Sequence, residues 1–205
     1  MNYILLMILM FLYFFWINTQ TYLSTDMSTN CTIKDRIHDS ELVYLFGSYL
    51  KNNTHVIKFH IGLTTFLLDV NIVGVMASCI WRNNFQAPLL LVAGVILRQT
   101  CQFINRLPIP TDMIWFDPGI PSLFMVYKVQ NDFFFSGHTL TSLILGLELI
   151  TFDSYLMKIY SVCFILYEII FVLVTKSHYW MDVYAAIATY FMMKYFYEKI
   201  SIVFV

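Results

Sequence analysis

Hydrophobic residues occur in six long runs along the chain, and polar stretches separate them. The runs cover residues 3–18, about 61–81, about 87–104, about 133–152, about 156–175 and about 181–205. Each is near the ~20 residues that a helix needs to cross a bilayer. In lipid only helices or closed barrels satisfy the backbone, and these runs are too long and continuous for barrel strands. The pattern therefore predicts an all-α polytopic membrane protein, a six-transmembrane-helix bundle.

The first run differs from a secretory signal peptide. Met1 and Asn2 offer no basic region before it, and no small-residue cleavage site follows it cleanly. We therefore interpret it as a retained first helix. The polar loop at 19–60 holds a short amphipathic stretch at 42–50, typical of a segment lying along the membrane surface. It also contains two glycosylation sequons, at Asn30 and Asn52, which matter only if the loop faces a lumen.

Composition agrees with a membrane location. Of the 205 residues, 59% are hydrophobic and 12% are charged, and a soluble domain would carry about twice that charged fraction. The net charge of −1 argues against nucleic acid as a partner. Lysines and arginines divide evenly between the two predicted faces, so they do not orient the bundle. Four cysteines show no CxxC spacing and predict no metal site. Without repeats or linkers, residues 1–205 are interpreted as one domain.

The stretch SHYWMDV at 177–183 carries the first sign of chemistry. His178 and Asp182 stand four residues apart, so on a helix they share a face and can meet. Asp182 can then accept a hydrogen bond from one ring nitrogen of His178. That contact fixes the tautomer and leaves the other nitrogen basic and nucleophilic.

A second histidine, His138, lies in the stretch FFFSGHTL at 133–140. It precedes His178 by 40 residues, which is the length of two membrane crossings, so both histidines should lie at one membrane face. The third run leads towards His138, so Arg98 or Arg106 also approaches that face. Two histidines, a carboxylate and an arginine suit phosphoryl transfer. They supply a nucleophile, an orienting base, a proton donor and a cation for the equatorial oxygens.

Each of these residues also has a plainer interpretation. A histidine at the end of a membrane helix is commonly an interfacial residue. Ser136 and Thr139 could cap the fourth helix, and Arg98 could snorkel from a helix end. Glu148 and Glu168 lie deeper, where a carboxylate is costly unless partnered, and they could pair across the bundle or form a proton path. The conjunction of residues at one face, rather than any single residue, favours chemistry.

Three stretches, taken together, resemble a known family. They are 98-RQTCQFINRLPIP-110, 131-NDFFFSGHT-139 and 178-HYWMDV-183. They resemble the sphingomyelin synthase-related branch of the lipid phosphatase (phosphatidic acid phosphatase type 2) superfamily. The first looks like its R-x8-L-P-x-P motif with Arg98 at the arginine, the second like G-D-x-x-x-S-G-H-T, and the third like H-Y-x-x-D-V. The resemblance covers about residues 61–205.

This resemblance implies a role for each matching residue. His178 would attack the lipid phosphorus and form a phosphohistidine, and Asp182 would orient and activate it. His138 would protonate the departing diacylglycerol oxygen and then take the proton from the acceptor hydroxyl. Three residues would help hold the phosphoryl oxygens, partly through backbone N–H groups at a helix start: Ser136, Gly137 and Thr139. The family's site lies on the lumenal or exoplasmic face, and both histidines have roles that need no metal or other cofactor.

The chain also departs from the wider superfamily. Asn131 stands where glycine is usual, and no K-x6-R-P motif is present. Val172 stands where an arginine is expected six residues before the second histidine, with Lys176 the nearest cation. No P-L-P-D motif precedes the second run. We therefore expect the phosphate clamp of the synthase branch or a reduced one, with Arg98 and Lys176 as its cations, and the acceptor lipid stays open.

Aromatic residues bear on the lipid headgroup. Two stand between carboxylates in 111-TDMIWFDPG-119, where Trp115 and Phe116 separate Asp112 from Asp117, and Tyr179 adjoins the candidate nucleophile. Aromatic rings with carboxylates suit a quaternary ammonium such as choline, although the same rings could form an interfacial aromatic belt. This pattern favours phosphocholine or phosphoethanolamine over phosphoinositol.

The predicted function is transfer of such a phospho-headgroup from a glycerophospholipid to ceramide or diacylglycerol. The predicted location is an endomembrane (ER or Golgi) or the plasma membrane. A lipid phosphate phosphatase would differ in that water resolves the phosphohistidine, and a dry site favours the lipid acceptor. A further alternative is a non-catalytic membrane protein or transporter that uses Glu148 and Glu168.

Overall fold

A computed structural model of the protein describes residues 33–105, 107–122, 127 and 133–203, the last four by their backbone alone, with isolated positions between 4 and 15. Those isolated positions, which are residues 4, 7, 8, 11, 12 and 15, are helical. The rest of the predicted first helix lies outside the described residues, as do the sequon at Asn30, Arg106 and Asn131.

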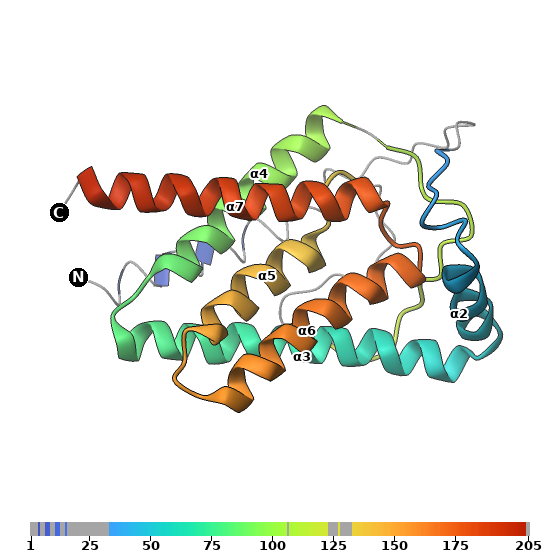
Figure 1. Ribbon diagram of the computed structural model, residues 1–205, viewed down its shortest axis with the longest axis horizontal. Helices are drawn as coiled ribbons and strands as arrows, with labels where there is room; N and C mark the ends of the chain where they lie inside the picture. Colours follow the sequence, from blue (N-terminus) through green and yellow to red (C-terminus); the bar gives the residue numbers. More distant parts are fainter. Residues whose placement is uncertain are drawn as a thin grey trace.

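The described residues form helices and no strands, which confirms the predicted all-α class for this part of the chain. In chain order the helices are α2 (Glu41–Asn52), α3 (Thr54–Arg82), α4 (Gln86–Ile104), α5 (Gly137–Ile150), α6 (Tyr155–Val174) and α7 (Trp180–Val203). Figure 1 shows α3 and α7 along opposite sides of the molecule, with α5 and α6 crossing obliquely between them and α2 at one end. The amphipathic stretch predicted at 42–50 is thus a helix, and its place at a membrane surface stays a prediction.

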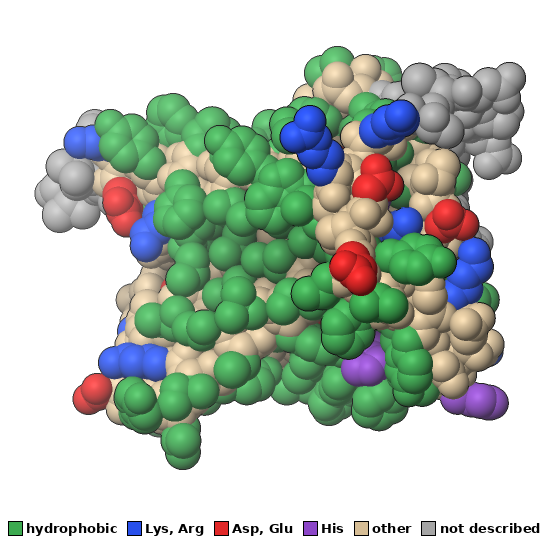
Figure 2. Space-filling view, turned by 45° about the vertical axis from the view of Figure 1, so that its right-hand side comes forward, with side chains coloured by type: hydrophobic (Ala, Val, Ile, Leu, Met, Phe, Trp, Pro, Cys, Tyr) green, Lys and Arg blue, Asp and Glu red, His purple; other side chains and the backbone are tan. Residues whose placement is uncertain are grey.

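Three of the described helices are long and apolar enough to cross a membrane: α3, α4 and α6. Helix α5 is apolar but has only 14 residues. Helix α7 has 24 residues, but it carries four charged side chains, Asp182, Lys194, Glu198 and Lys199. Figure 2 shows hydrophobic side chains over the middle of the visible face and charged side chains towards its two ends. These features fit a membrane protein with at least three spans.

The fourth apolar run begins its helix later than predicted. The helix starts at Gly137 rather than at residue 133, because Phe135 adopts φ 45° and breaks the helical path. A positive φ is unfavourable for a bulky residue, and here it turns Phe133 and Phe135 into the core, where each is 1% exposed. Ser136 then caps the helix, since its hydroxyl accepts a hydrogen bond from the backbone N–H of Thr139.

Helix α3 begins seven residues before the predicted start of the second run. Its first two turns carry exposed polar residues, so they do not look apolar as a continuous run. Ile57 and Ile61 are nevertheless fully buried and four residues apart, which is helical spacing. The helix therefore extends as an amphipathic segment beyond its apolar part.

Helix α5 lies at the centre of the bundle and packs against α3, α4, α6 and α7. Small residues allow this close approach. A Cβ at Gly146 would lie 2.6 Å from the side chain of Ile165 on α6, and a Cβ at Gly94 on α4 would lie 2.7 Å from that of Leu140. Such contacts matter because helices in lipid associate through close packing rather than through the hydrophobic effect. This close packing fixes the position of α5 among its neighbours.

Four helix ends meet at one end of the molecule, on the right in Figure 1. Helices α4 and α6 finish there, and α5 and α7 start there. We call this end, with residues 98, 135–139 and 175–182 at its centre, the site end. Both histidines therefore lie at one end of the bundle, and the assignment of this end to one membrane face stays a prediction.

Candidate active site

His178 and Asp182 form a buried pair at the site end, although they do not share a helix as predicted: Asp182 lies in α7, and His178 lies in the bend two residues before that helix begins. Nδ1 of His178 lies 3.2 Å from Oδ2 of Asp182, and the two side chains are 6% and 1% exposed. The same carboxylate oxygen accepts the backbone N–H of Tyr179 at 3.1 Å. Because a carboxylate only accepts, Nδ1 carries the hydrogen and Nε2 is left with the basic lone pair. Asp182 also lies in the first turn of α7, where the helix dipole favours a negative charge.

His138 lies in the first turn of α5 and is 7% exposed. Its ring meets the edge of Trp115, with the ring centres 6.0 Å apart and the planes at 78°. Two hydroxyls flank it and are fully buried: Ser136, which caps the helix, and Thr139, whose Oγ1 has no hydrogen-bond partner among the described residues. The start of α5 thus presents a histidine, a free hydroxyl and the N–H groups of a helix N-terminus, which suit an anion.

Arg98 packs directly on this helix start. The side chain is 8% exposed, and its Nε donates to the carbonyl of Phe135 at 3.3 Å. A Cβ at Gly137 would lie 3.1 Å from both Cζ and Nε of Arg98. With any other residue here the guanidinium would have to move away from the helix start, because this approach is tighter than most Cβ contacts. Arg98 thus lies beside the S-G-H-T stretch, as predicted for one of two arginines, and the other, Arg106, lies outside the described residues.

The loop between α4 and α5 covers the site end. The hydroxyl of Tyr179 donates to the carbonyl of Pro108 at 3.0 Å, so the L-P-I-P stretch touches the residue after His178. The backbone N–H of Ile114 donates to the carbonyl of Thr175 at 2.8 Å. Phe133 presents its ring edge-on to that of His178, with centres 5.9 Å apart. This cover helps to keep His178 buried, at 5% exposed.

Two predicted substrate-binding residues have less direct positions. Tyr179 is 4% exposed and its hydroxyl is engaged by Pro108, so it contributes packing to the site end. Lys176 adopts φ 53° in the turn before His178 and is half-buried, and its charge acts on His38. The carboxylates predicted around the headgroup are engaged elsewhere. Asp112 pairs with Lys51 at 3.3 Å in an exposed contact, and Asp117 accepts from the backbone of Gly119.

Sequence reasoning missed His38 and Asp35. Nε2 of His38 lies 3.0 Å from the carbonyl oxygen of His178, and Oδ2 of Asp35 accepts the backbone N–H of Trp180 at 2.6 Å. Burial lowers the pKa of His38 from its usual 6.5, opposed in part by the negative charge of Asp35. Both residues lie in a polar loop about 140 residues before α7, and no local pattern marks them.

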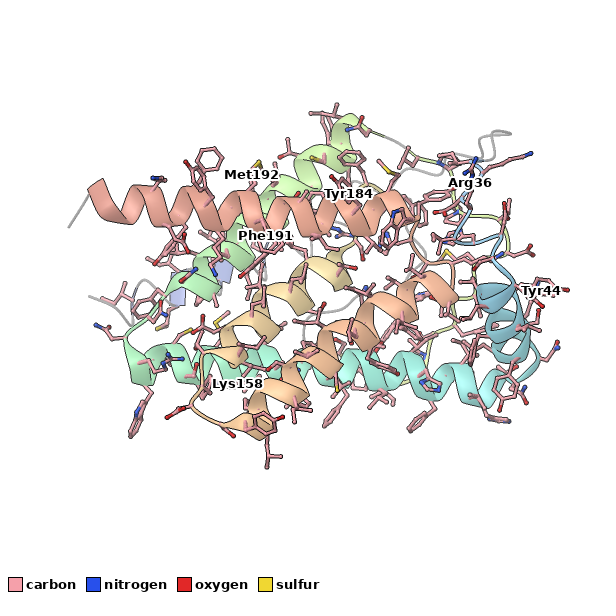
Figure 3. All side chains as sticks on the ribbon, in the orientation of Figure 1. Arg36, Tyr44, Lys158, Tyr184, Phe191 and Met192 are labelled. Atoms are coloured by element: carbon pink, nitrogen blue, oxygen red, sulfur yellow. The ribbon has the colours of Figure 1, made fainter. Side chains whose placement is uncertain are left out.

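A groove of about 900 Å³ borders the site end between the 33–37 segment, α4 and α7. Phe135, Tyr179 and Asp182 belong to its lining. Its long wall is apolar and includes three residues of α7 at helical spacing, Tyr184, Ala188 and Met192. Figure 3 shows Arg36 beyond the start of α7, and Tyr184 and Met192 along that helix. The groove lining thus combines apolar side chains of α4 and α7 with Lys34 and Arg36 of the 33–37 segment.

The two glutamates of the alternative interpretation lie apart from this constellation. Oε1 of Glu148 is 3.6 Å from Nη1 of Arg82, which is the last residue of α3 at the opposite end of the bundle. Glu168 is fully buried in α6, and neither carboxylate oxygen has a hydrogen-bond partner among the described residues. Within the same residues, no group of three or more His, Cys, Asp or Glu side chains could hold a metal ion.

Comparisons with known proteins identify no relative. No protein-family model matches the chain, and no curated protein and no solved structure matches it. Function is therefore inferred from the residues at the site end.

Proposed function

We propose that the protein is a membrane lipid phosphotransferase that moves a phospho-headgroup from a glycerophospholipid to ceramide or diacylglycerol. The sphingomyelin synthase-like motifs suggest this activity. The observation that carries it is the joining of three motifs at one end of the bundle. His178 is paired with Asp182, the backbone N–H of Ser136 bonds to the carbonyl of Asp182, and Arg98 packs on Gly137.

In the first step, Nε2 of His178 attacks the phosphorus of the donor lipid. The N–P bond forms as the bond from phosphorus to the diacylglycerol oxygen breaks. His138 supplies the proton that this leaving oxygen takes up. Asp182 holds the other ring nitrogen and stabilises the positive charge that develops on the ring. The products are diacylglycerol and a phosphohistidine that carries the headgroup.

In the second step, the acceptor lipid resolves the phosphohistidine. His138, now neutral, takes the proton from the acceptor hydroxyl while that oxygen attacks phosphorus. The N–P bond then breaks, and His178 returns to its starting form. General acid–base help of this kind is worth about 10²–10⁴-fold in rate.

Negative charge on the transferring group meets positive groups at the start of α5. The Arg98 guanidinium is a fixed cation there, since Phe135 and Gly137 hold it in place. The Oγ1 of Thr139 and the N–H groups of the first helical turn supply donors. Phosphorus bound between this helix start and His178 would be open to attack from Nε2.

Two features favour a lipid acceptor over water. The candidate nucleophile is buried behind Phe133 and the 107–122 loop. The apolar groove that borders the site end, about 900 Å³ in volume, has room for acyl chains. Water exclusion of this kind favours transfer over hydrolysis.

We also propose that the bundle crosses the membrane six times, with the first apolar run and α3 to α7 as crossings. An even number of crossings leaves both chain ends on one side and the site end on the lumenal or exoplasmic side. The compartment would be the ER or Golgi, or the plasma membrane. The headgroup is phosphocholine or phosphoethanolamine, of which Trp115 beside His138 could contact the amine.

A headgroup-transfer assay tests this proposal. Membranes containing the protein receive headgroup-labelled phosphatidylcholine or phosphatidylethanolamine. The acceptor is ceramide, or diacylglycerol whose acyl chains differ from those of the donor so that chromatography separates the product from the donor. We expect label in a new lipid with the natural protein and with His55→Ala, an exposed histidine outside the site. His138→Ala and His178→Ala should abolish it. Label only in water-soluble phosphate esters would make the protein a phosphatase. If the protein's function in cells were lost in Glu168→Gln but kept in His178→Ala, the transporter alternative would be favoured.

A further inference from the structure

Two hydrogen bonds join the segment before α2 to the start of α7. Oδ2 of Asp35 accepts the first N–H of the helix, from Trp180, at 2.6 Å. Three residues later in the chain, Nε2 of His38 lies 3.0 Å from the carbonyl oxygen of His178. The first contact caps the helix that carries Asp182, and the second holds the main chain of the candidate nucleophile.

His38 is bound as a donor. A carbonyl oxygen only accepts, so Nε2 must carry the hydrogen. The side chain is buried, 6% exposed, and its ring stacks on that of Tyr179 with the centres 5.8 Å apart and the planes at 26°. Three charged groups act on the ring, namely Asp35, Asp39 and Lys176. The ring donates from Nε2 whether neutral or charged, so this contact persists over a wide pH range.

The carbonyl of His178 needs a donor from outside α7. The N–H groups of Asp182 and Val183 both bond to the carbonyl of Tyr179, at 3.0 and 3.3 Å. The helix ladder therefore begins one residue after His178 and leaves its carbonyl to other donors. On the other side of His178, its own N–H makes only a long contact of 3.4 Å with the carbonyl of Val172. The peptide between His178 and Tyr179 is thus held at its carbonyl by His38, and at its N–H by Oδ2 of Asp182 at 3.1 Å.

We propose that His38 is a positioning residue for the reaction proposed above. Its hydrogen bond to the His178 carbonyl fixes the peptide from which the imidazole projects. That peptide determines whether Nδ1 reaches Asp182 and where Nε2 points. Without the donor the peptide keeps only the bond from the Tyr179 N–H to Asp182, so the carbonyl can tilt and the His178–Asp182 contact loosens. Misplacement of a reacting group by about 1 Å can cost about 100-fold in rate.

Two substitutions separate the hydrogen bond from the stacking. His38→Gln keeps an N–H donor at similar reach and loses the ring. His38→Phe keeps a ring to stack on Tyr179 and loses the donor. We expect kcat for headgroup transfer to fall about 10- to 100-fold in His38→Phe with KM little changed, and less than about threefold in His38→Gln. His55→Gln and His55→Phe, at the exposed histidine, are the matched controls.

A second readout needs no lipid turnover, so it separates this proposal from the proposed function. Histidine-labelled full-length protein in detergent micelles should show the hydrogen-bonded Nδ1 proton of His178, assigned by its loss in His178→Ala. We expect its exchange with water to rise about 10-fold or more in His38→Phe and to stay near the natural rate in His38→Gln.

The outcomes divide clearly. Slow proton exchange in His38→Gln and fast exchange in His38→Phe support the positioning role, even if no lipid is turned over by the natural protein. Natural exchange and natural kcat in His38→Phe overturn it. Equal damage in both variants also overturns it, because the stacked ring and not the donor would then matter.

Discussion

The backbone N–H of Ser136 donates to the backbone carbonyl of Asp182 at 3.0 Å. This bond ties the residue that caps α5 to the first turn of α7, although the two are 46 residues apart in the chain. It joins the S-G-H-T stretch to the H-Y-x-x-D-V stretch through main-chain atoms. Helix packing therefore determines the placement of His138 relative to His178 more than the mobility of any one side chain does.

Removing the negative charge of Asp182 should make His178 a poorer nucleophile, although the side chain at position 182 keeps its size. In Asp182→Asn the side chain retains its size, but it can no longer stabilise positive charge on the imidazole. The amide can also turn its NH₂ towards Nδ1 and favour the wrong tautomer. We expect kcat for headgroup transfer to fall about 10²–10⁴-fold. Asp153→Asn, at an exposed aspartate between α5 and α6, should leave the rate unchanged. A rate within twofold of the natural protein in Asp182→Asn would contradict this role.

A methyl group at Gly137 should displace Arg98. The added Cβ would lie 3.1 Å from Cζ and Nε of that arginine, which is too close without movement. We expect a loss of about 10- to 100-fold in kcat/KM, because the cation shifts away from the phosphoryl group. Gly74→Ala is the matched control, since a Cβ there meets nothing within 4 Å. If both variants were fully active, the guanidinium would not be held for phosphate.

A larger side chain in the groove should weaken the binding of long-chain donor lipids more than that of short-chain ones. Ala188 lies between Tyr184 and Met192 on one face of α7, so Ala188→Trp would narrow the groove. We expect KM for a long-chain donor lipid to rise about 10-fold, with a smaller effect on a short-chain analogue. Phe191→Trp places the same ring on α7 outside the groove lining and serves as control. An equal effect on both chain lengths would argue that acyl chains bind elsewhere.

The buried His38 should make the fold sensitive to mild acid. Burial lowers its pKa from the usual 6.5, so below that pH the unfolded chain binds a proton before the folded protein does. Stability contributed by this residue is therefore retained above pH 6.5 and declines as the pH falls through 6.5 towards the folded pKa. Melting temperatures in detergent, taken about one pH unit apart from about pH 7.5 to 5, measure this decline in stability.

The comparison is between the natural protein, His38→Gln and His55→Gln. We expect the melting temperature of His38→Gln to fall less with acid than that of the other two. Parallel curves for all three proteins would show that His38 does not control the acid response.

The His178–Asp182 contact was predicted, but its geometry was not. His178 lies two residues before α7 begins at Trp180, and Asp182 reaches back over the helix start, where the same carboxylate oxygen accepts the N–H of Tyr179. The common end of both histidines could be predicted because the 40 residues between them hold two helices, α5 and α6, that run along the bundle and back. Arg98 could be placed near the same end for a similar reason. Its contact with Gly137 could not be predicted, since it depends on how α4 and α5 cross.

Other features escaped prediction because they depend on loops and bends. Phe135 adopts a positive φ that its type disfavours, so the fourth apolar run did not show where the helix begins. His38 stands in a polar loop and reaches its partner only through the tertiary fold. The start of α3 was hidden by the exposed polar residues of its first turns, although Ile57 and Ile61 already have helical spacing.

The central claim is that His178 carries the headgroup during transfer, and direct trapping tests it best. Full-length protein in lipid vesicles receives donor lipid with a labelled headgroup phosphorus and no acceptor, and the reaction is stopped in alkali, in which phosphohistidine survives. Mass spectrometry then locates the label. We predict label on His178 that moves to a new lipid when ceramide or diacylglycerol is added, and no label in His178→Ala. Active protein without label at His178, or label that persists in His178→Ala, would contradict the mechanism.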